Sequence, residues 1–285
     1  MEQTKVYLNG DIVDESAACI SVNDAGFLHG ASAFTTLAAF NGRPFRIDRH
    51  LERLLDTVGL LGLRTDQTRE TLATAVTDVL AANGLHDRAR IRITLSGGDL
   101  RTGVPTSVVT ASPLPEYPPA YYTQGIRVVI APFRQVAGDP TFGYKTGCYF
   151  PRILARQEAA RKGAVDALWF TAANRLAEGC FTNVFLVKDG ALRTPARDSP
   201  VLPGVTREAV LELAQTLNIP ADAEADLLID DLLGADEVFI TASTMGIVPV
   251  AQVEASIVGD GAVGAVTNRL MDALNQLIDR ETKEA

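Results

Sequence analysis

Lys145 lies in a segment that could give a lysine unusual chemistry. Of the five lysines in the chain, it is the one flanked by aromatic and small residues, in Phe142-Gly143-Tyr144-Lys145-Thr146-Gly147-Cys148-Tyr149-Phe150. Apolar surroundings favour the neutral amine of a lysine, and a neutral amine can form a Schiff base with a carbonyl group. A lysine whose stem packs on aromatic rings while its ammonium group reaches water would give the same pattern.

Glu178 is an acidic residue followed by glycine, between two segments with the composition of strands. A carboxylate in such a turn can point into a cleft. A cofactor with a pyridine ring needs an acidic partner of this kind to keep its ring nitrogen protonated. A solvated loop glutamate fits the same position.

Residues 202–207, Leu-Pro-Gly-Val-Thr-Arg, lead directly into an expected helix. The start of a helix presents N–H groups and a positive dipole end, and Thr206 adds a hydroxyl group, so the segment could bind a phosphate. A simple threonine N-cap with Glu208 in the first turn is the alternative interpretation.

Two further segments could also bind phosphate oxygens. Arg53 lies on the polar side of an expected helix, and arginine can hold a phosphate through two hydrogen bonds. Ser243 and Thr244 follow an expected strand in the hydroxyl-rich run Thr-Ala-Ser-Thr. Each segment alone is ambiguous, whereas their combination indicates a phosphate-bearing cofactor.

The elements that must position these residues show both strand and helix patterns, and their mixture without strict alternation favours an α+β fold. An opening hairpin turns at Asn9-Gly10, and a strand over residues 34–40 ends at Asn41-Gly42. The expected helices are residues 49–61, 68–82, 151–162, 206–217 and 263–278, and the other expected strands are residues 90–95, 107–111, 126–131, 167–170, 184–187 and 237–241.

The proline-rich run of residues 113–119 marks the expected domain boundary, because four prolines in seven residues disfavour a helix or a central strand. We expect an N-terminal α/β domain over residues 1–115, an interdomain linker over residues 116–125, and a larger C-terminal cofactor-binding domain over residues 126–285.

Composition excludes several classes of function. A net charge of -9 argues against a nucleic-acid partner, and no apolar stretch is long enough to span a membrane. The start of the chain lacks the pattern of a secretory signal, and the three cysteines show no paired spacing, so we expect a reducing, cytoplasmic location. The three histidines form no ligand-spaced pair, so no metal site is predicted.

The order of these motifs resembles the fold-type-IV (class IV) family of pyridoxal-phosphate enzymes, over nearly the whole chain. That family includes branched-chain aminotransferases, D-amino-acid aminotransferases, R-selective amine transaminases and aminodeoxychorismate lyases. The resemblance is carried by Tyr7-Leu8-Asn9-Gly10, residues 24–30, residues 50–54, residues 145–149, Glu178-Gly179, Asn183-Val184-Phe185, residues 202–207, residues 235–239 and Pro249-Val250.

The resemblance implies a two-domain protein, usually a homodimer, with pyridoxal 5′-phosphate bound between its domains. By position, Lys145 would form the Schiff base and Glu178 would partner the pyridine nitrogen. Tyr149 would hydrogen-bond the ring hydroxyl, and Leu202 would pack on the ring. The phosphate would be held by Arg53, Val205, Thr206, Ser243 and Thr244.

The implied activity is a ping-pong transfer of an amino group from an amino acid or primary amine to a 2-keto acid, with Lys145 moving the substrate proton. An aminodeoxychorismate lyase, which releases pyruvate and 4-aminobenzoate, is the alternative. Its resemblance rests on Phe34-Thr35-Thr36, where Thr36 would assist proton transfer, and on the glycine-rich residues 95–103.

Ala242 and the Lys-Thr-Gly-Cys-Tyr context of residues 145–149 favour the transaminase. Phe34 is expected to contact the substrate, and either Arg92 or Arg101 could bind its carboxylate. A catalytically inactive, ligand-binding member of the family is a third interpretation. It is disfavoured because the lysine and the phosphate ligands are all present.

Overall fold

The computed structural model describes residues 4–136 and 138–283 and divides the chain into two compact units. The first unit comprises Met1–Pro115, Tyr144–Cys148 and Ile278–Ala285, and the second comprises Glu116–Gly143 and Tyr149–Leu277. Residues 116–125, expected as a linker, contain a short helix and lie in the second unit. The segment around Lys145 lies in the first unit, although the expected division placed it in the C-terminal domain.

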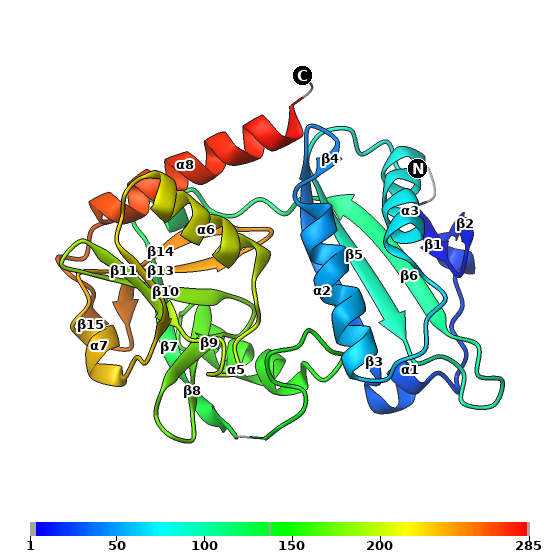
Figure 1. Ribbon diagram of the computed structural model, residues 1–285, viewed down its shortest axis with the longest axis horizontal. Helices are drawn as coiled ribbons and strands as arrows, with labels where there is room; N and C mark the ends of the chain where they lie inside the picture. The colour runs from blue at the N-terminus through cyan, green and yellow to red at the C-terminus, as the bar shows by residue number, and fades with distance from the viewer. Residues whose placement is uncertain (1–3, 137, 284–285) are drawn as a thin grey trace. The chain divides into compact units, whose positions relative to one another are not determined.

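The first unit is built on one antiparallel sheet with strand order β2-β1-β6-β5-β3-β4 (Figure 1). The hairpin of β1 and β2 turns at Asn9 and Gly10 with positive φ angles, as the Asn-Gly signal predicted. The elements of this unit are β1 (Lys5–Leu8), β2 (Asp11–Asp14), η1 (Glu15–Ala17), α1 (Ala25–His29), β3 (Ser32–Phe40), β4 (Arg43–Pro44), α2 (Ile47–Leu60), α3 (Arg69–Ala82), β5 (Ala89–Ser96) and β6 (Thr106–Pro113).

Helices α2 and α3 cover one face of this sheet (Figure 1). The strand period explains which residues they cover, because alternate residues of β3 and β5 point to opposite faces. Leu37 of β3 and its register partner Ile91 of β5 are fully buried in the core beneath the helices. Phe34 and Thr36 therefore point to the opposite face. The expected helices 49–61 and 68–82 are confirmed within about two residues.

The second unit is built on a mixed sheet with strand order β12-β11-β10-β13-β14-β7-β8-β9, with β15 added at β14. Strand β7 runs parallel to both β14 and β8, and helix α5 packs on β7 and β8 through Ala155 and Ala159. The elements are α4 (Ala120–Thr123), β7 (Ile126–Gln135), α5 (Phe150–Arg161), β8 (Asp166–Thr171), β9 (Leu176–Gly179), β10 (Asn183–Lys188), β11 (Ala191–Pro195), α6 (Val205–Thr216), β12 (Ala221–Ala225), α7 (Ile229–Leu233), β13 (Glu237–Ala242), β14 (Gly246–Val253), β15 (Ser256–Ile257) and α8 (Ala265–Thr282). Helix α8 belongs to this unit as far as Leu277.

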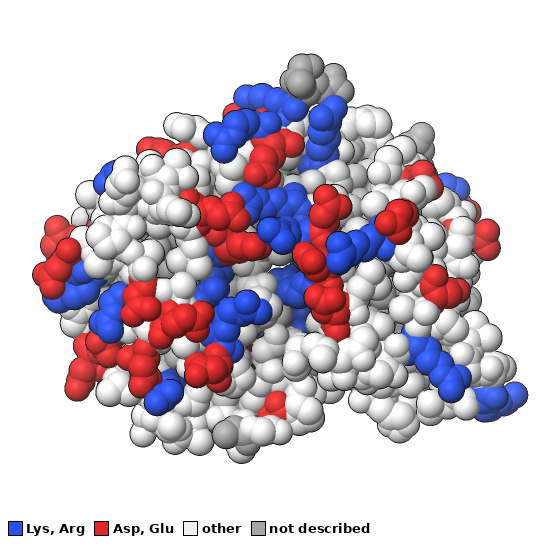
Figure 2. All heavy atoms as spheres, in the orientation of Figure 1, with Lys and Arg blue, Asp and Glu red and all other residues white. Residues whose placement is uncertain are grey.

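Charged side chains are interspersed on the surface, and Figure 2 shows acidic and basic groups side by side on one face. Several form exposed ion pairs, such as Lys188 with Asp236 at 2.8 Å and Arg175 with Asp226 at 3.1 Å. No helix in the described ranges is long and apolar enough to cross a membrane. Within those same ranges, no group of three His, Cys, Asp or Glu residues is arranged to hold a metal ion.

Candidate active site

Lys145 is held against strand β3 by backbone hydrogen bonds within the first unit. The Phe34 amide donates to the Lys145 carbonyl at 2.8 Å, and the Gly147 amide donates to the Ser32 carbonyl at 2.7 Å. Gly147 makes this approach possible, because a Cβ atom there would lie 2.7 Å from the Gly30 carbonyl oxygen. Lys145 therefore joins the first unit through a long-range backbone contact rather than through its neighbours in sequence.

The Phe34 ring contacts both Lys145 and Arg92. The Nζ atom of Lys145 lies 4.8 Å from the ring centroid, and the guanidinium carbon of Arg92 lies 3.7 Å from it. Thr36 is the register partner of Arg92 and lies on the same sheet face as Phe34. The structure thus brings together Lys145, Phe34, Thr36 and Arg92, all named from the sequence.

Arg101 lies elsewhere, in the exposed turn between β5 and β6. Its backbone amide donates to the Asp99 carboxylate at 2.7 Å. The Ser21 hydroxyl has the largest effect on this carboxylate, and together with the Thr102 and Arg101 amides it lowers the pKa of Asp99 to about 2. Arg92, and not Arg101, contacts the same Phe34 ring as Lys145.

Arg53 of α2 is oriented by Thr35 and His50, which the sequence analysis did not assign to the site. The Nη2 atom of Arg53 donates to Thr35 Oγ1 at 3.1 Å, and Thr35 Oγ1 lies 2.9 Å from His50 Nδ1. Burial, followed by the charges of Arg53 and Lys145, holds the pKa of His50 well below its usual value of 6.5. His50 is therefore a neutral hydrogen-bonding group, and the guanidinium of Arg53 is fixed by a buried hydroxyl.

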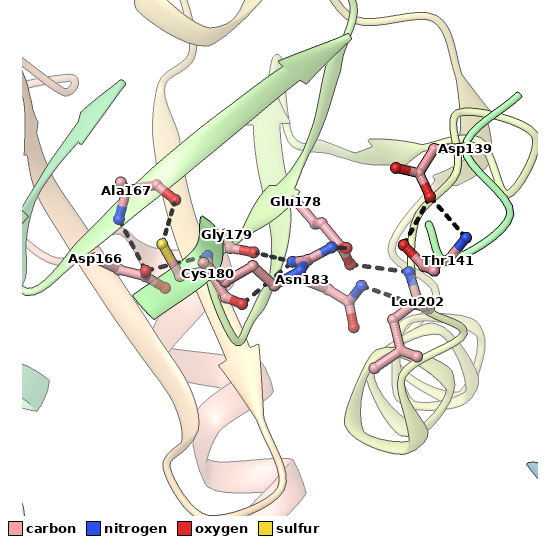
Figure 3. A network of polar contacts seen from close by, with 10 residues as sticks. Asp139, Thr141, Asp166, Ala167, Glu178, Gly179, Cys180, Asn183 and Leu202 are labelled. Carbon is pink, nitrogen blue, oxygen red and sulfur yellow. Dashed lines mark hydrogen bonds and ion pairs between the residues drawn. The ribbon is translucent and has the colours of Figure 1, made fainter. Parts of the chain in front are cut away.

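Glu178 of β9 is buried in the second unit, and both of its carboxylate oxygens accept hydrogen bonds (Figure 3). Oε1 pairs with Arg152 Nη2 at 2.5 Å, and Oε2 accepts from the Leu202 amide at 2.9 Å. The Asn183 side-chain amide donates to the Leu202 carbonyl at 2.9 Å. These bonds fix Leu202 beside the Glu178 carboxylate, as Figure 3 shows.

Arg152 is a residue of this site that the sequence analysis missed. The available signal was its spacing, because Arg152, Ala155 and Ala159 share one buried face of helix α5. A charge on a buried helix face requires a partner. The ring of Tyr149, just before the same helix, lies 5.3 Å from the Arg152 guanidinium. Although burial opposes the charge, the carboxylate of Glu178 raises the Arg152 pKa above its ordinary value.

The start of helix α6 differs from the simple threonine cap considered from the sequence. Gly204 is the N-cap residue, and Thr206 is the second residue of the helix, where it is buried. A Cβ atom at position 204 would overlap the Asn183 side-chain oxygen, so an alanine there would require the Asn183 side chain to move. The first-turn amides of Val205 and Thr206 and the Thr206 hydroxyl are groups that could bind a phosphate.

Ser243 and Thr244 lie in the turn that follows β13, and Tyr117 contacts Thr244 through its hydroxyl at 3.2 Å. Strand β13 pairs with β10 so that Thr241 lies opposite Asn183, the residue that contacts Leu202 and Gly204. Thr241 Oγ1 is buried without a hydrogen-bond partner among the described residues. The 243–244 turn and the start of α6 therefore lie at the same end of this sheet.

The model for the amino-transferase class IV family matches residues 32–253, and the chain belongs to that family. It is 32% identical over 280 residues to a putative branched-chain-amino-acid aminotransferase of Methanocaldococcus jannaschii, covering 96% of each chain. The solved branched-chain aminotransferase of Escherichia coli superimposes with a TM-score of 0.92 at 30% identity, covering 99% of this chain and 97% of that one. The T.th. branched-chain aminotransferase solved with pyridoxamine 5′-phosphate superimposes with a TM-score of 0.91 at 25% identity, covering 99% and 96%.

These findings define the molecule as an α+β, fold-type-IV, pyridoxal-5′-phosphate-dependent aminotransferase. It transfers an amino group between an amino acid and a 2-keto acid, and the comparisons do not favour the lyase alternative. The side chains and backbone groups in these two units match the chemical groups of the cofactor. The second unit offers a buried carboxylate for a ring nitrogen and a helix start with hydroxyl groups for a phosphate, and the first unit offers a lysine amine and an oriented arginine.

Proposed function

We propose that this chain is a branched-chain-amino-acid aminotransferase in which Lys145 holds pyridoxal 5′-phosphate as a Schiff base. The observation that carries the proposal is the position of Lys145 Nζ over the Phe34 ring, which also contacts the guanidinium of Arg92. Neighbouring positive charges favour the neutral amine of a lysine, which is the form that reacts with a carbonyl. The relatives named above, all branched-chain aminotransferases by name, support the substrate class.

Three residues of the second unit would hold the cofactor ring. The Glu178 carboxylate, already held by two hydrogen bonds, would accept a hydrogen bond from the protonated ring nitrogen, and Leu202 beside it would pack on the ring face. Tyr149 would donate to the ring hydroxyl. When bound, the cofactor supplies an electron sink for negative charge that develops at the substrate Cα.

The phosphate would be held by Arg53 from the first unit and by groups of the second unit. In the latter, the amides of Val205 and Thr206 and the Thr206 hydroxyl lie at the start of α6, and Ser243 and Thr244 lie at the same sheet end. The Thr35–His50 pair would keep the Arg53 guanidinium in one orientation before any phosphate binds. A preoriented arginine loses little conformational entropy on binding.

The substrate would contact the face of the first sheet that carries Phe34. Arg92 would bind its carboxylate, and the Phe34 ring would contact its apolar side chain. Lys145 Nζ would carry the proton removed from the substrate Cα, and the Thr36 hydroxyl on the same face would assist that transfer.

We further propose a homodimer in the cytoplasm. Exposed apolar side chains gather where α1 and the turn after β5 meet, with Phe27 73% and Leu100 59% exposed. The Leu100 amide donates to the Asn23 carbonyl at 3.0 Å, so the two segments are joined. An apolar patch of this kind supports contact with a second copy of the chain. The cysteines at positions 19, 148 and 180 are all free thiols, which supports a reducing compartment.

The test is a half-reaction with purified protein loaded with pyridoxal 5′-phosphate. Leucine, isoleucine and valine in L and D configurations are supplied singly, and conversion to the aminated cofactor is followed by absorbance. We expect the branched-chain amino acids to convert the cofactor to its aminated form faster than alanine and aspartate do. Absence of conversion by every amino acid, with pyruvate release from aminodeoxychorismate, would overturn the proposal. Analytical ultracentrifugation of the same sample measures its mass and shows whether the protein is a dimer.

A further inference from the structure

The guanidinium of Arg152 has no assigned part in the reaction, although it contacts the carboxylate expected to face the cofactor. The Arg152 and Glu178 side chains are 8% and 4% exposed, and their charged groups lie 2.5 Å apart. Taking two charges out of water is costly, and their attraction offsets that cost only in good geometry. The close contact means that the positive charge of Arg152 acts directly on the Glu178 carboxylate.

The guanidinium is held in place independently of Glu178. Its Nη1 atom donates to the carbonyl oxygens of Gly179 at 3.1 Å and Cys180 at 3.2 Å. The rings of Tyr149 and Trp169 lie 5.3 and 5.7 Å from its central carbon. Arg152 is therefore a fixed positive charge beside the turn that follows Glu178.

The other ionisable groups around Glu178 do not replace this cation. The Asp166 carboxylate accepts hydrogen bonds from the Cys180 amide at 3.1 Å and from Thr182 Oγ1 at 2.8 Å. Burial, followed by the charge of Asp166, raises the pKa of the Cys180 thiol to about 12, so that thiol stays neutral. Among the described residues, the cation in contact with the Glu178 carboxylate is Arg152.

Resting on the proposed function, in which Glu178 accepts a hydrogen bond from the protonated ring nitrogen, we propose that Arg152 acts through Glu178 to lower the proton affinity of that nitrogen. The carboxylate would be shared between a guanidinium group and the ring nitrogen. A fixed positive charge near a second protonated group disfavours its protonation. Arg152 would thereby limit how strongly the cofactor ring withdraws charge from the substrate Cα. It is a positioning residue, since its effect passes through Glu178.

The experiment uses holoenzyme loaded with pyridoxal 5′-phosphate carrying ¹⁵N at the ring nitrogen, whose resonance reports protonation. Arg152→Gln is expected to raise the proton affinity of the ring nitrogen by about tenfold or more, because a like charge is removed. Arg152→Lys keeps the charge and should give the wild-type resonance. Arg156→Gln is the matched control, because Arg156 lies exposed on the same helix with its guanidinium 5.2 Å from the Phe181 ring. An unchanged resonance in Arg152→Gln overturns the inference.

If Arg152→Gln does not fold, the wild-type holoenzyme supplies the test. Its ring-nitrogen resonance is followed from about pH 6 to about pH 10, a range in which the guanidinium stays charged. The resonance is expected to move toward the unprotonated position, and a resonance that stays at the protonated position throughout overturns the inference. A wild-type protein that binds no pyridoxal 5′-phosphate would instead overturn the proposed function.

Discussion

Thr35 and Thr36 are consecutive residues of β3, and their side chains lie on opposite faces of the first sheet. Thr35 is fully buried and accepts a hydrogen bond from Arg53, whereas Thr36 lies opposite Arg92 on the face that carries Phe34. The Phe-Thr-Thr run, interpreted from sequence as a sign of lyase chemistry, is thus divided between two roles. One threonine orients an expected phosphate ligand, and the other faces the expected substrate.

Thr35→Val should weaken cofactor binding, because valine has nearly the same shape and cannot accept the Arg53 hydrogen bond. We expect the dissociation constant of pyridoxal 5′-phosphate to rise roughly fivefold to fiftyfold, the loss of one charge-assisted hydrogen bond. Titration of cofactor-free protein measures it. Thr36→Val is the control and should change turnover rather than cofactor affinity. Equal affinities for Thr35→Val and wild type would contradict the role assigned to Thr35.

Arg92→Gln should raise KM for the keto acid about tenfold or more, since it removes a charged hydrogen-bond donor to a carboxylate. Steady-state kinetics with the keto acid varied at saturating amino donor measure the effect. Arg101→Gln changes the same residue type in an exposed turn and should leave KM unchanged. The assignment would be reversed if Arg101→Gln, and not Arg92→Gln, raised KM.

The sequence predicted the long elements and the cofactor chemistry better than it predicted the contacts between them. Hairpins at Asn9 and Asn41 and the helices over α2, α3, α5 and α6 follow from local signals, namely Asn-Gly turns and apolar spacing. The short strands β9, β11 and β12 were not predicted, because four or five residues carry too little pattern, and the eight-residue strand β14 was also not predicted.

The missed parts of the site depend on long-range pairing. Lys145 joins the first unit through its backbone contact with Phe34 of β3, and no local pattern encodes that contact. The Thr35–His50 bond and the Arg152–Glu178 pair likewise join different elements. A buried charge on a helix face was visible in the spacing of Arg152, but its partner could be found only in the folded structure.

Gly204→Ala should destabilise the protein by about 1–3 kcal/mol, because the added Cβ overlaps the Asn183 side-chain oxygen and displaces the hydrogen bond from Asn183 to the Leu202 carbonyl. Gly59→Ala is the matched control in helix α2, where a Cβ atom meets nothing within 4 Å. That change should stabilise by about 0.5–1 kcal/mol through helix propensity. Chemical denaturation of both variants gives the difference, and destabilisation of similar size in both would contradict the steric argument.

Stability should fall on acidification below about pH 6.5 because of His50. Its pKa is lowered in the folded protein, first by burial and then by the charges of Arg53 and Lys145. The unfolded chain therefore binds the proton first, and stability present above about pH 6.5 is lost as the pH falls toward the lower, folded-state pKa. The loss approaches about 1.4 kcal/mol per pH unit for one residue. His50→Gln should flatten this slope in denaturation curves, and an unchanged slope would show that other groups carry it.

The most direct test of the account is the identity of the residue that bears the cofactor. Holoenzyme is treated with borohydride, which reduces a Schiff base to a stable bond, and the digested protein is analysed by mass spectrometry. The account predicts a phosphopyridoxyl group on Lys145, with Lys145→Ala unlabelled, colourless and inactive in the half-reaction. Stable labelling of another lysine, or full activity in Lys145→Ala, would contradict it.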